Sequence, residues 1–322
     1  MNCIKNNSII NKVMFAPRIS SYDEDLGVCW IDNICCLFLA YANGKANVLV
    51  HDSVLETRPV IIICHGNACD IGNITNFGKK ICVECRSHVL LYEYPGYGLS
   101  IGTPTENSCV EGIIKVINHL NEKMNIPIQN MIFFGQSIGS GIATAAYKYC
   151  KTQFNHSPAA LILISPYLSI KALAKDILSS TFVPVMERFD SKENIKCCDT
   201  GLLIIHGEHD QIIPVSHGIA LNEISTCRIK ILDIVLDATH NNIPEIRILS
   251  KCNELFKNIL NLIDFNVLYH NNNFSFLLQQ EKETNLNSHS NCISTVIASS
   301  VEATTACSIN TSNSLIDNCI LF

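Results

Sequence analysis

Three side chains that could carry out acyl transfer together occur in the order serine, aspartate, histidine along this chain of 322 residues. They are Ser137, in the G-x-S-x-G sequence of residues 135–139, then Asp210 and His240. A serine hydroxyl becomes an effective nucleophile only when a base takes its proton, and a carboxylate must hold that base in the correct tautomer. The pattern therefore predicts Ser137 as the nucleophile, His240 as the base and Asp210 as the acid.

The G-x-S-x-G sequence lies between an apolar run and a stretch of small residues. Residues 131–134 are typical of a buried strand, and the Ala-rich stretch that continues to residue 146 is typical of a closely packed helix. At such a strand-to-helix turn only glycine fits beside the serine, whose hydroxyl is pushed out above the sheet. The alternative is a glycine-rich helix start with an incidental serine, because five residues alone have little specificity. The flanking strand and helix favour the nucleophile.

The two predicted partners of the serine each follow a predicted strand. Asp210 comes after the apolar run 202–205, and His240 comes just after the last strand, 229–236. In an enzyme of this layout the chain order is serine, then acid, then histidine, with each residue on a loop at the carboxyl end of a strand. Asp210 and His240 meet both requirements.

Other polar residues near these positions could take the same roles. Glu208 and Asp237 compete with Asp210, which could also be a helix-capping or solvated loop aspartate. His206 and His209 are expected to have structural roles. His65 is a weaker candidate for the base, since a histidine between a strand end and a glycine more often supports the loop.

The oxyanion site is predicted from the loop that follows the strand at 60–64. In an acyl-transfer enzyme of this layout, the loop after the third strand supplies one backbone N–H to the oxyanion, and the residue after the nucleophile supplies the other. The loop here is residues 65–72, so these two groups are the N–H groups of Asn67 and Ile138.

Cys82 and Cys85 form a C-x-x-C sequence with His88 nearby. A zinc or redox site is the alternative to ordinary packing, but no second pair of ligands has suitable spacing. Two cysteines three residues apart on an amphipathic helix are usually part of the core. No metal or cofactor is expected.

Strands alternate with helices over most of the chain, which predicts parallel pairing in an α/β sheet. We expect an N-terminal arm at 1–25 that lies on the domain outside its core, one domain at 26–263, and a disordered tail rich in Asn, Ser and Thr at 264–322. The domain is predicted to hold a mostly parallel, eight-stranded sheet with helices on both faces and a short lid insert at about 166–199. Predicted strands are 26–31, 34–41, 60–64, 89–94, the run from 131, 160–164, 202–205 and 229–236; predicted helices include 74–85, 105–121 and 244–263.

The composition of the chain limits which cellular compartment and which kinds of partner we expect. The formal net charge of −6 argues against nucleic acid, and the N-terminus lacks the apolar core of a secretory signal. The 17 cysteines are an odd number, so reduced thiols and a cytoplasmic location are expected. The longest apolar runs, such as 34–42 and 159–164, are too short to span a bilayer.

Several short motifs together resemble those of a known family. They are His65-Gly66-Asn67-Ala68 with Asp70 and Gly72, residues 94–98, residues 135–139, Ser165-Pro166, His206-Gly207 with Asp210, residues 216–218 and His240-Asn241. On these residues the chain resembles the α/β-hydrolases, and in particular the alpha/beta hydrolase domain-containing protein 17 family of depalmitoylating serine hydrolases, over about 26–263. It departs from that family in two places: the N-terminal cysteine cluster that carries the membrane anchors is reduced to Cys3, and residues 237–239 replace a glycine-rich approach to the catalytic histidine.

The resemblance implies a serine hydrolase that cleaves an ester or thioester through an acyl-enzyme, with S-acylated proteins as substrates. A carboxylesterase or monoacylglycerol-type lipase that acts on acyl-ester lipids is the first alternative, and a non-catalytic scaffold with a hydrolase fold is the second. The sequence leaves the acyl-chain length, the protein substrate and the oligomeric state open.

The chain ends in Cys319-Ile320-Leu321-Phe322, which fits C-a-a-X with a terminal residue that favours geranylgeranyl. A frayed tail that happens to contain cysteine is the alternative. One lipid chain gives marginal binding, so stable anchoring needs a second signal, such as palmitoylation of Cys307 or Cys3. The hypothesis is a peripheral association with the cytosolic face of membranes through Cys319.

Overall fold

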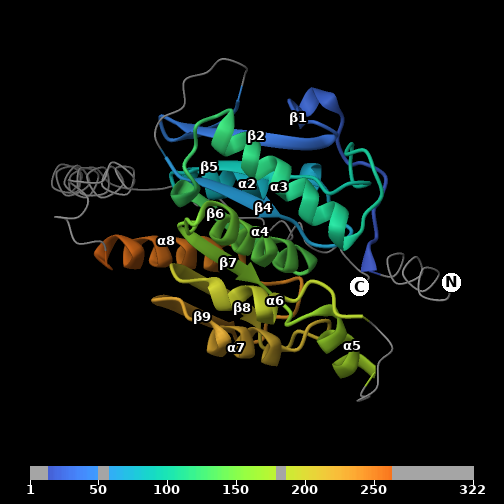
Figure 1. The fold of residues 1–322 in the computed structure, drawn as a ribbon, viewed down its shortest axis with the longest axis vertical. Coiled ribbons are helices and arrows are strands. Elements are labelled where there is room, and N and C mark those ends of the chain that lie inside the picture. Colours follow the sequence, from blue (N-terminus) through green and yellow to red (C-terminus); the bar gives the residue numbers. More distant parts are fainter. Residues whose placement is uncertain (1–13, 50–57, 179–185, 263–322) are drawn as a thin grey trace, which may run out of the picture.

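The computed structural model describes residues 14–49, 58–178 and 186–262, which form a nine-stranded sheet covered by helices (Figure 1). The strand order is β1-β2-β5-β4-β6-β7-β8-β9. Strand β3 is off this path: it pairs with residues 39–42 of β2, whereas β1 pairs with residues 34–36. The six strands from β4 to β9 pair in parallel, whereas β2 is antiparallel to β1, β3 and β5. The strands are β1 Cys29–Ile31, β2 Ile34–Ala42, β3 Lys45–Val48, β4 Val60–Cys64, β5 His88–Tyr92, β6 Met131–Gln136, β7 Ala160–Ile164, β8 Gly201–Gly207 and β9 Ile229–Val235.

Helices cover both faces of the sheet, as the sequence predicted. Helices α2 and α8 contribute to one buried cluster, and α3, α4 and α7 contribute to the other. Helices α5 and α6 belong to the connection between β7 and β8. The helices are α2 Ile71–Glu84, α3 Glu106–Glu122, α4 Ile138–Phe154, α5 Ile170–Leu178, α6 Ser191–Asn194, α7 Val215–Ile224 and α8 Glu245–Leu262, with short 3-10 turns η1 Glu24–Leu26, η2 Ile128–Asn130 and η3 Ile195–Cys197.

The prediction of eight strands is wrong by one, because the sequence pattern did not reveal β3. Its four residues, Lys45–Val48, alternate between exposed and half-buried positions and lack the continuous apolar run of the central strands. Its pairing with β2 is antiparallel and follows a tight turn with Asn43 and Gly44 at positive φ. The first predicted strand is also shorter than expected, because Glu24–Leu26 forms a 3-10 turn and β1 begins only at Cys29.

Helix α2 begins three residues earlier than predicted because Asp70 caps it. The Asp70 carboxylate accepts a hydrogen bond from the Asn73 N–H, and the Asn73 side chain accepts one from the Asp70 N–H. Such a capping box satisfies N–H groups that have no partner inside the helix. The helix therefore starts at Ile71, directly after the loop that follows β4.

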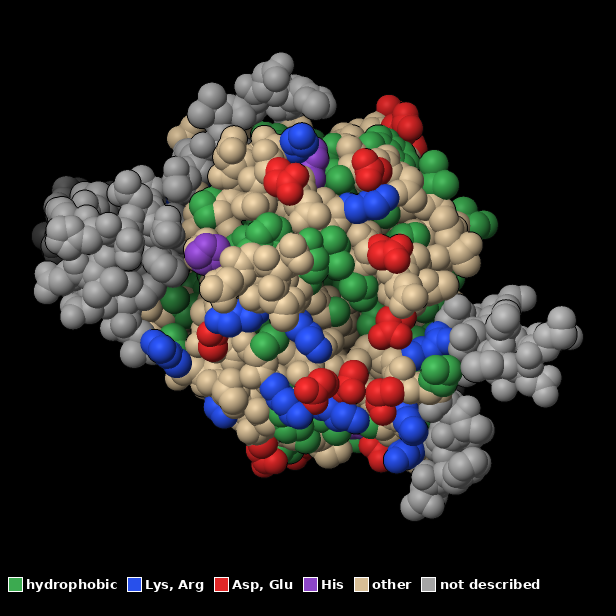
Figure 2. All heavy atoms as spheres, in the orientation of Figure 1, with side chains coloured by type: hydrophobic (Ala, Val, Ile, Leu, Met, Phe, Trp, Pro, Cys, Tyr) green, Lys and Arg blue, Asp and Glu red, His purple; other side chains and the backbone are tan. Residues whose placement is uncertain are grey.

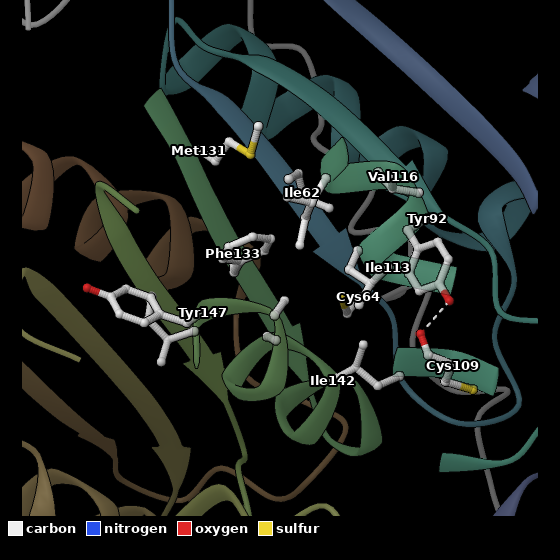
Figure 3. Close-up of a cluster of buried hydrophobic side chains, with 14 of the residues drawn as sticks. Ile62, Cys64, Tyr92, Cys109, Ile113, Val116, Met131, Phe133, Ile142 and Tyr147 are labelled. Atoms are coloured by element: carbon white, nitrogen blue, oxygen red, sulfur yellow. Dashed lines mark hydrogen bonds between the residues drawn. The ribbon is translucent and has the colours of Figure 1, made fainter. Parts of the chain in front are cut away.

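Figure 3 shows how the sheet packs against α3 and α4. Ile62 of β4 and Phe133 of β6 lie on adjacent strands and face the helix residues Ile113 and Ile142. The Tyr92 hydroxyl is buried here and donates a 2.7 Å hydrogen bond to the Cys109 carbonyl oxygen, the dashed line in the figure. A buried hydroxyl without a partner would cost roughly 1–3 kcal/mol, and this bond avoids that cost.

The expectation that the N-terminal arm lies outside the core is wrong for Met14 and Phe15, whereas residues 16–25 are exposed or half-buried. Met14 and Phe15 are buried in the cluster that also holds α3 and α4. Phe15 packs edge-on against Phe189, with ring centroids 6.2 Å apart. These two residues were missed because the apolar run that contains them, residues 13–16, is short and shows no periodicity over a longer segment.

None of the helices in the described ranges is long and apolar enough to cross a membrane. On the face that Figure 2 shows, acidic and basic side chains are interspersed over the surface. Cys3, Cys307 and Cys319, and with them the predicted tail and lipidation site, lie outside the described residues.

Candidate active site

The structure brings the three predicted triad residues into one hydrogen-bonded chain. Nε2 of His240 lies 2.9 Å from Oγ of Ser137, and Nδ1 of His240 lies 2.7 Å from Oδ2 of Asp210. The residues come from positions just after β6, β8 and β9, which end at the same edge of the sheet. Both distances are those of ordinary hydrogen bonds, so the hydroxyl, the imidazole and the carboxylate form the relay that acyl transfer requires.

Ser137 stands at a sharp turn between β6 and α4. Its backbone has φ 53° and ψ −120°, which is unusual for a residue with a side chain. A Cβ atom on Gly135 would lie 2.5 Å from the Gly139 carbonyl oxygen, and one on Gly139 would overlap the Cys64 carbonyl oxygen. Both flanking glycines are therefore required by close backbone contacts, as the sequence predicted.

Asp210 is buried, and hydrogen bonds to both of its oxygens hold it. Oδ1 accepts from the N–H groups of Ile212 and Ile213, at 2.9 and 2.8 Å, while Oδ2 faces His240. Burial acts to raise the pKa of this carboxyl, but hydrogen bonds from His206, His240 and the backbone outweigh it and hold the pKa well below the usual range. Asp210 is thus ionised at neutral pH.

The competing acids point elsewhere. The Asp237 side chain is 96% exposed, and its Oδ1 lies 3.7 Å from Nε2 of His209. Glu208 is also exposed and lies near the same histidine nitrogen, at 3.9 Å. Asp237 adopts a positive φ of 59°, so the loop before His240 makes its turn at a residue other than glycine.

The sequence assigned His206 a structural role, and the structure places it against the acid. Its Nε2 lies 2.8 Å from the Ile213 carbonyl oxygen and 3.3 Å from Oδ2 of Asp210. The side chain is fully buried. Its place four residues before Asp210, at the end of a buried strand, was the only sequence signal of this contact.

The two predicted oxyanion residues flank the serine from different elements. Ile138 is the first residue of α4, where an N–H group has no acceptor inside its own helix. Asn67 belongs to the loop after β4 and borders the same cavity as Ser137. Its side chain holds the N-terminal segment: Oδ1 accepts from the Ala16 N–H at 2.9 Å, and Nδ2 donates to the Met14 carbonyl oxygen at 3.0 Å. The sequence gave no indication of this second role.

His65 lies under this loop and faces away from the serine. Nδ1 is 2.8 Å from the Gly66 carbonyl oxygen, and Nε2 is 2.8 Å from Oε1 of Glu93. Both neighbours offer acceptor oxygens, so a proton on either ring nitrogen would have a hydrogen-bond partner. Burial acts to lower the pKa of His65, but the Glu93 charge and hydrogen bond outweigh it and the net shift is upward. His65 is a loop support, as the sequence favoured.

A cavity of about 420 Å³ opens beside the triad. This volume falls in the range of small-molecule sites. The wall is mixed. Its polar lining consists of Arg18, Ser21, Asn67, Asn73, Asn76, Gln136, Ser137, His240, Asn241 and Glu245. The apolar lining consists of Ile19, Ile74, Phe77, Ile164, Ile212, Ile243 and Ile248.

The C-x-x-C pair of the sequence is part of the core. Cys82 and Cys85 are buried with residues of β2, β5 and α8, and Sγ of Cys82 lies 3.8 Å from the Leu39 carbonyl oxygen. Nδ1 of His88 accepts a hydrogen bond from the Tyr41 N–H. In the ranges that the structure describes, no three His, Cys, Asp or Glu side chains are grouped so that they could hold a metal ion.

Comparison with known proteins agrees with this architecture. Residues 56–197 match the family described as serine aminopeptidase, S33. The fold is similar to that of the solved structure of Est1E from Butyrivibrio proteoclasticus with ferulic acid bound, with a TM-score of 0.55 at 15% identity; the match covers 72% of this chain and 98% of that one. At this identity the similarity is one of fold.

Two relatives are similar in sequence as well. Alpha/beta hydrolase L404 of Acanthamoeba polyphaga mimivirus is 33% identical over 219 residues, which are 66% of this chain and 79% of the viral protein. Alpha/beta hydrolase domain-containing protein 17B of Homo sapiens is 31% identical over 215 residues, which are 64% of this chain and 67% of the human protein. The chain therefore belongs to the α/β-hydrolases and is similar to their domain-containing protein 17 group.

Proposed function

We propose that this protein is a serine hydrolase that cleaves acyl thioesters or esters through an acyl-enzyme. The observation that carries the proposal is the hydrogen-bonded chain from Ser137 through His240 to Asp210, which borders a cavity with several apolar side chains in its wall. A scaffold without activity would not need a serine held at φ 53° in reach of an imidazole. Such strain is kept where surrounding contacts impose it, and it is common at active sites.

In the proposed mechanism, Oγ of Ser137 attacks the acyl carbonyl carbon while its proton passes to Nε2 of His240. Asp210 holds the imidazole through Nδ1 and stabilises the imidazolium that forms. The N–H groups of Asn67 and Ile138 bind the negative oxygen of the tetrahedral intermediate. When the intermediate collapses, the thiolate or alkoxide leaves with the proton from His240. Water, deprotonated by His240, then attacks the acyl-serine and releases the fatty acid.

We infer that S-acylated protein is the preferred substrate class. The similarity to the domain-containing protein 17 group supports this inference, and so does the apolar lining of the cavity, which suits a long acyl chain. An acylglycerol would place the same kind of chain in the same cavity, so a lipid esterase is the alternative. No cofactor is required by either reaction.

The test compares three substrates with the purified full chain: a palmitoyl-cysteine peptide, a monoacylglycerol and a four-carbon ester. We expect the highest kcat/KM for the palmitoyl peptide, and no turnover of any substrate by the Ser137→Ala variant. If the monoacylglycerol gives the higher kcat/KM, the protein is a lipase and the proposed thioesterase activity is wrong. Turnover that persists in Ser137→Ala would overturn the proposed mechanism.

A further inference from the structure

A segment near the N-terminus forms part of the wall of the catalytic cavity. We call residues 16–21 the strap; it runs along the edge of the sheet where β4 and β5 end (dark blue in Figure 1). Arg18, Ile19 and Ser21 line the same cavity as Ser137 and His240. By contrast, no described residue of the insert between β7 and β8, the predicted lid, lines it. The strap is thus a part of the cavity wall that the sequence did not predict.

The first end of the strap is fixed by Asn67 and Tyr97. The Ala16 N–H donates to Oδ1 of Asn67 at 2.9 Å and also lies 3.0 Å from the Tyr97 hydroxyl oxygen. The Tyr97 hydroxyl donates to the same Asn67 oxygen at 2.7 Å. Just before the strap, Phe15 is buried in the core. This end is therefore tied directly to the loop that is proposed to bind the oxyanion.

The second end is fixed by Asp70 and Glu93. The Ser21 N–H and hydroxyl both donate to the Asp70 carboxylate, at 2.6 and 2.5 Å. The next residue, Tyr22, donates its hydroxyl to Oε2 of buried Glu93 at 2.9 Å. Because hydrogen bonds to carboxylates are among the stronger ones in proteins, this end is also held firmly.

Two motif glycines provide the surface on which this second end rests. A Cβ atom on Gly72 would overlap the Ser21 hydroxyl oxygen and lie 3.0 Å from Cβ of Tyr22. A Cβ atom on Gly98 would overlap the Tyr22 hydroxyl oxygen. Side chains at either position would displace the segment. The first turn of α2 and the loop that follows β5 are thus shaped to receive it.

Between its two anchored ends the strap presents Ile19. This side chain is 96% exposed although it lines the catalytic cavity together with other apolar side chains. Exposed isoleucine gains stability when an apolar group covers it. An acyl chain bound at Ser137 and extending along this wall would provide that cover.

Building on the proposed function, we propose that the strap is a wall of the acyl-binding site and that Ile19 determines chain-length preference by contact with the distal part of the acyl chain. A four-carbon chain ends close to the serine, whereas a sixteen-carbon chain must continue along the wall. Contact with Ile19 therefore contributes to the binding of long chains and not of short ones. The anchors keep this contact in a fixed position.

The first test measures kcat/KM of Ile19→Ala on four-carbon and sixteen-carbon thioesters. We expect a loss of roughly tenfold for the long chain, since burying one isoleucine side chain is worth about that factor or more, and less than a twofold change for the short chain. Ile101→Ala is the matched control, because Ile101 is 66% exposed and does not line the cavity. An unchanged ratio between the two substrates, or an equal change in Ile101→Ala, would overturn the proposal.

The second test does not depend on turnover. Binding of palmitate is measured by calorimetry with Ser137→Ala and with Ser137→Ala combined with Ile19→Ala, both as full chains. We expect the double variant to bind palmitate roughly tenfold more weakly than Ser137→Ala does. Butyrate should bind more weakly than palmitate, and with the same affinity to both proteins. Equal affinity for palmitate would overturn the role of Ile19. A failure of the proposed function would give a different result: the wild-type protein would bind palmitate but would turn over none of the substrates.

Discussion

His206 and His240 approach the same oxygen of the acid: Nε2 of His206 lies 3.3 Å from Oδ2 of Asp210, and Nδ1 of His240 lies 2.7 Å from it. The other carboxylate oxygen, Oδ1, accepts hydrogen bonds from two backbone N–H groups, so both oxygens of the acid have polar partners that fix its position. His206 does not touch the serine and would act only by positioning Asp210.

His206→Ala is therefore expected to lower kcat/KM by roughly ten- to a hundredfold, the range that corresponds to losing a hydrogen bond to a charged group. The fall should lie mainly in kcat, because the cavity lining is unchanged. His209→Ala is the matched control: this side chain is 59% exposed and should leave kcat within twofold. Equal activity of both variants would show that the contact with Asp210 has no catalytic importance.

The identity of the acid can be tested by a pair of conservative changes. Asp210→Asn should lower kcat by about 10⁴ while the protein still unfolds cooperatively, because the amide would hold His240 in the wrong tautomer. Asp237→Asn changes a side chain that is 96% exposed and should leave kcat close to that of the wild type. The assignment is wrong if Asp237→Asn proves the more damaging of the two.

The buried pair of His65 and Glu93 predicts a pH dependence of stability. Because the pKa of His65 is raised in the folded protein, its contribution to the free energy of unfolding is fully present below the unfolded value of about 6.5 and is lost as pH rises through the folded value. In Glu93→Gln the two largest raising influences are removed, and burial then lowers the pKa of His65 against only the weaker effects of the Gly66 carbonyl and Asp70. The stability difference between wild type and variant should therefore shrink as pH rises.

Urea unfolding at a series of pH values from 5 to 9 would measure this difference. Lys80→Gln, which removes one partner of an exposed ion pair with Glu245, serves as a control whose effect should not follow the titration of a buried histidine. A difference that grows with rising pH would contradict the assignment of the charged pair.

Some parts of this site could be predicted from the sequence, and others could not. Ser137, Asp210 and His240 were found because each follows a strong apolar strand signal in a known order, and these local patterns determine where the loops emerge. The glycine pair around the serine was found for the same reason.

The contacts of the strap, which the sequence did not predict, are long-range. Asn67 bonds Ala16, which is 51 residues away, and Asp70 bonds Ser21 at a separation of 49. The sequence pattern near residue 16 does not indicate that this segment contacts residue 67, and the pattern near residue 67 does not indicate it either. β3 was missed for a different reason, since its four residues alternate in burial and carry no continuous apolar run.

Association with membranes through the C-terminal cysteine stays a prediction from the sequence. Wild type and Cys319→Ser expressed in cells should partition differently on fractionation, with less Cys319→Ser in the membrane fraction. The same distribution for both proteins would count against lipidation at Cys319.

The central claim is that Ser137 is a nucleophile activated by His240. The most direct measurement is covalent labelling of the purified wild type, Ser137→Ala and Ser140→Ala by a fluorophosphonate, followed by mass spectrometry of the labelled peptide. Ser140 lies in the same turn, but its hydroxyl donates to the Ser137 carbonyl oxygen at 2.6 Å, so its replacement should leave labelling intact. The account predicts one adduct, on Ser137, in wild type and Ser140→Ala, with none in Ser137→Ala; an adduct on Ser137→Ala at the wild-type rate would contradict it.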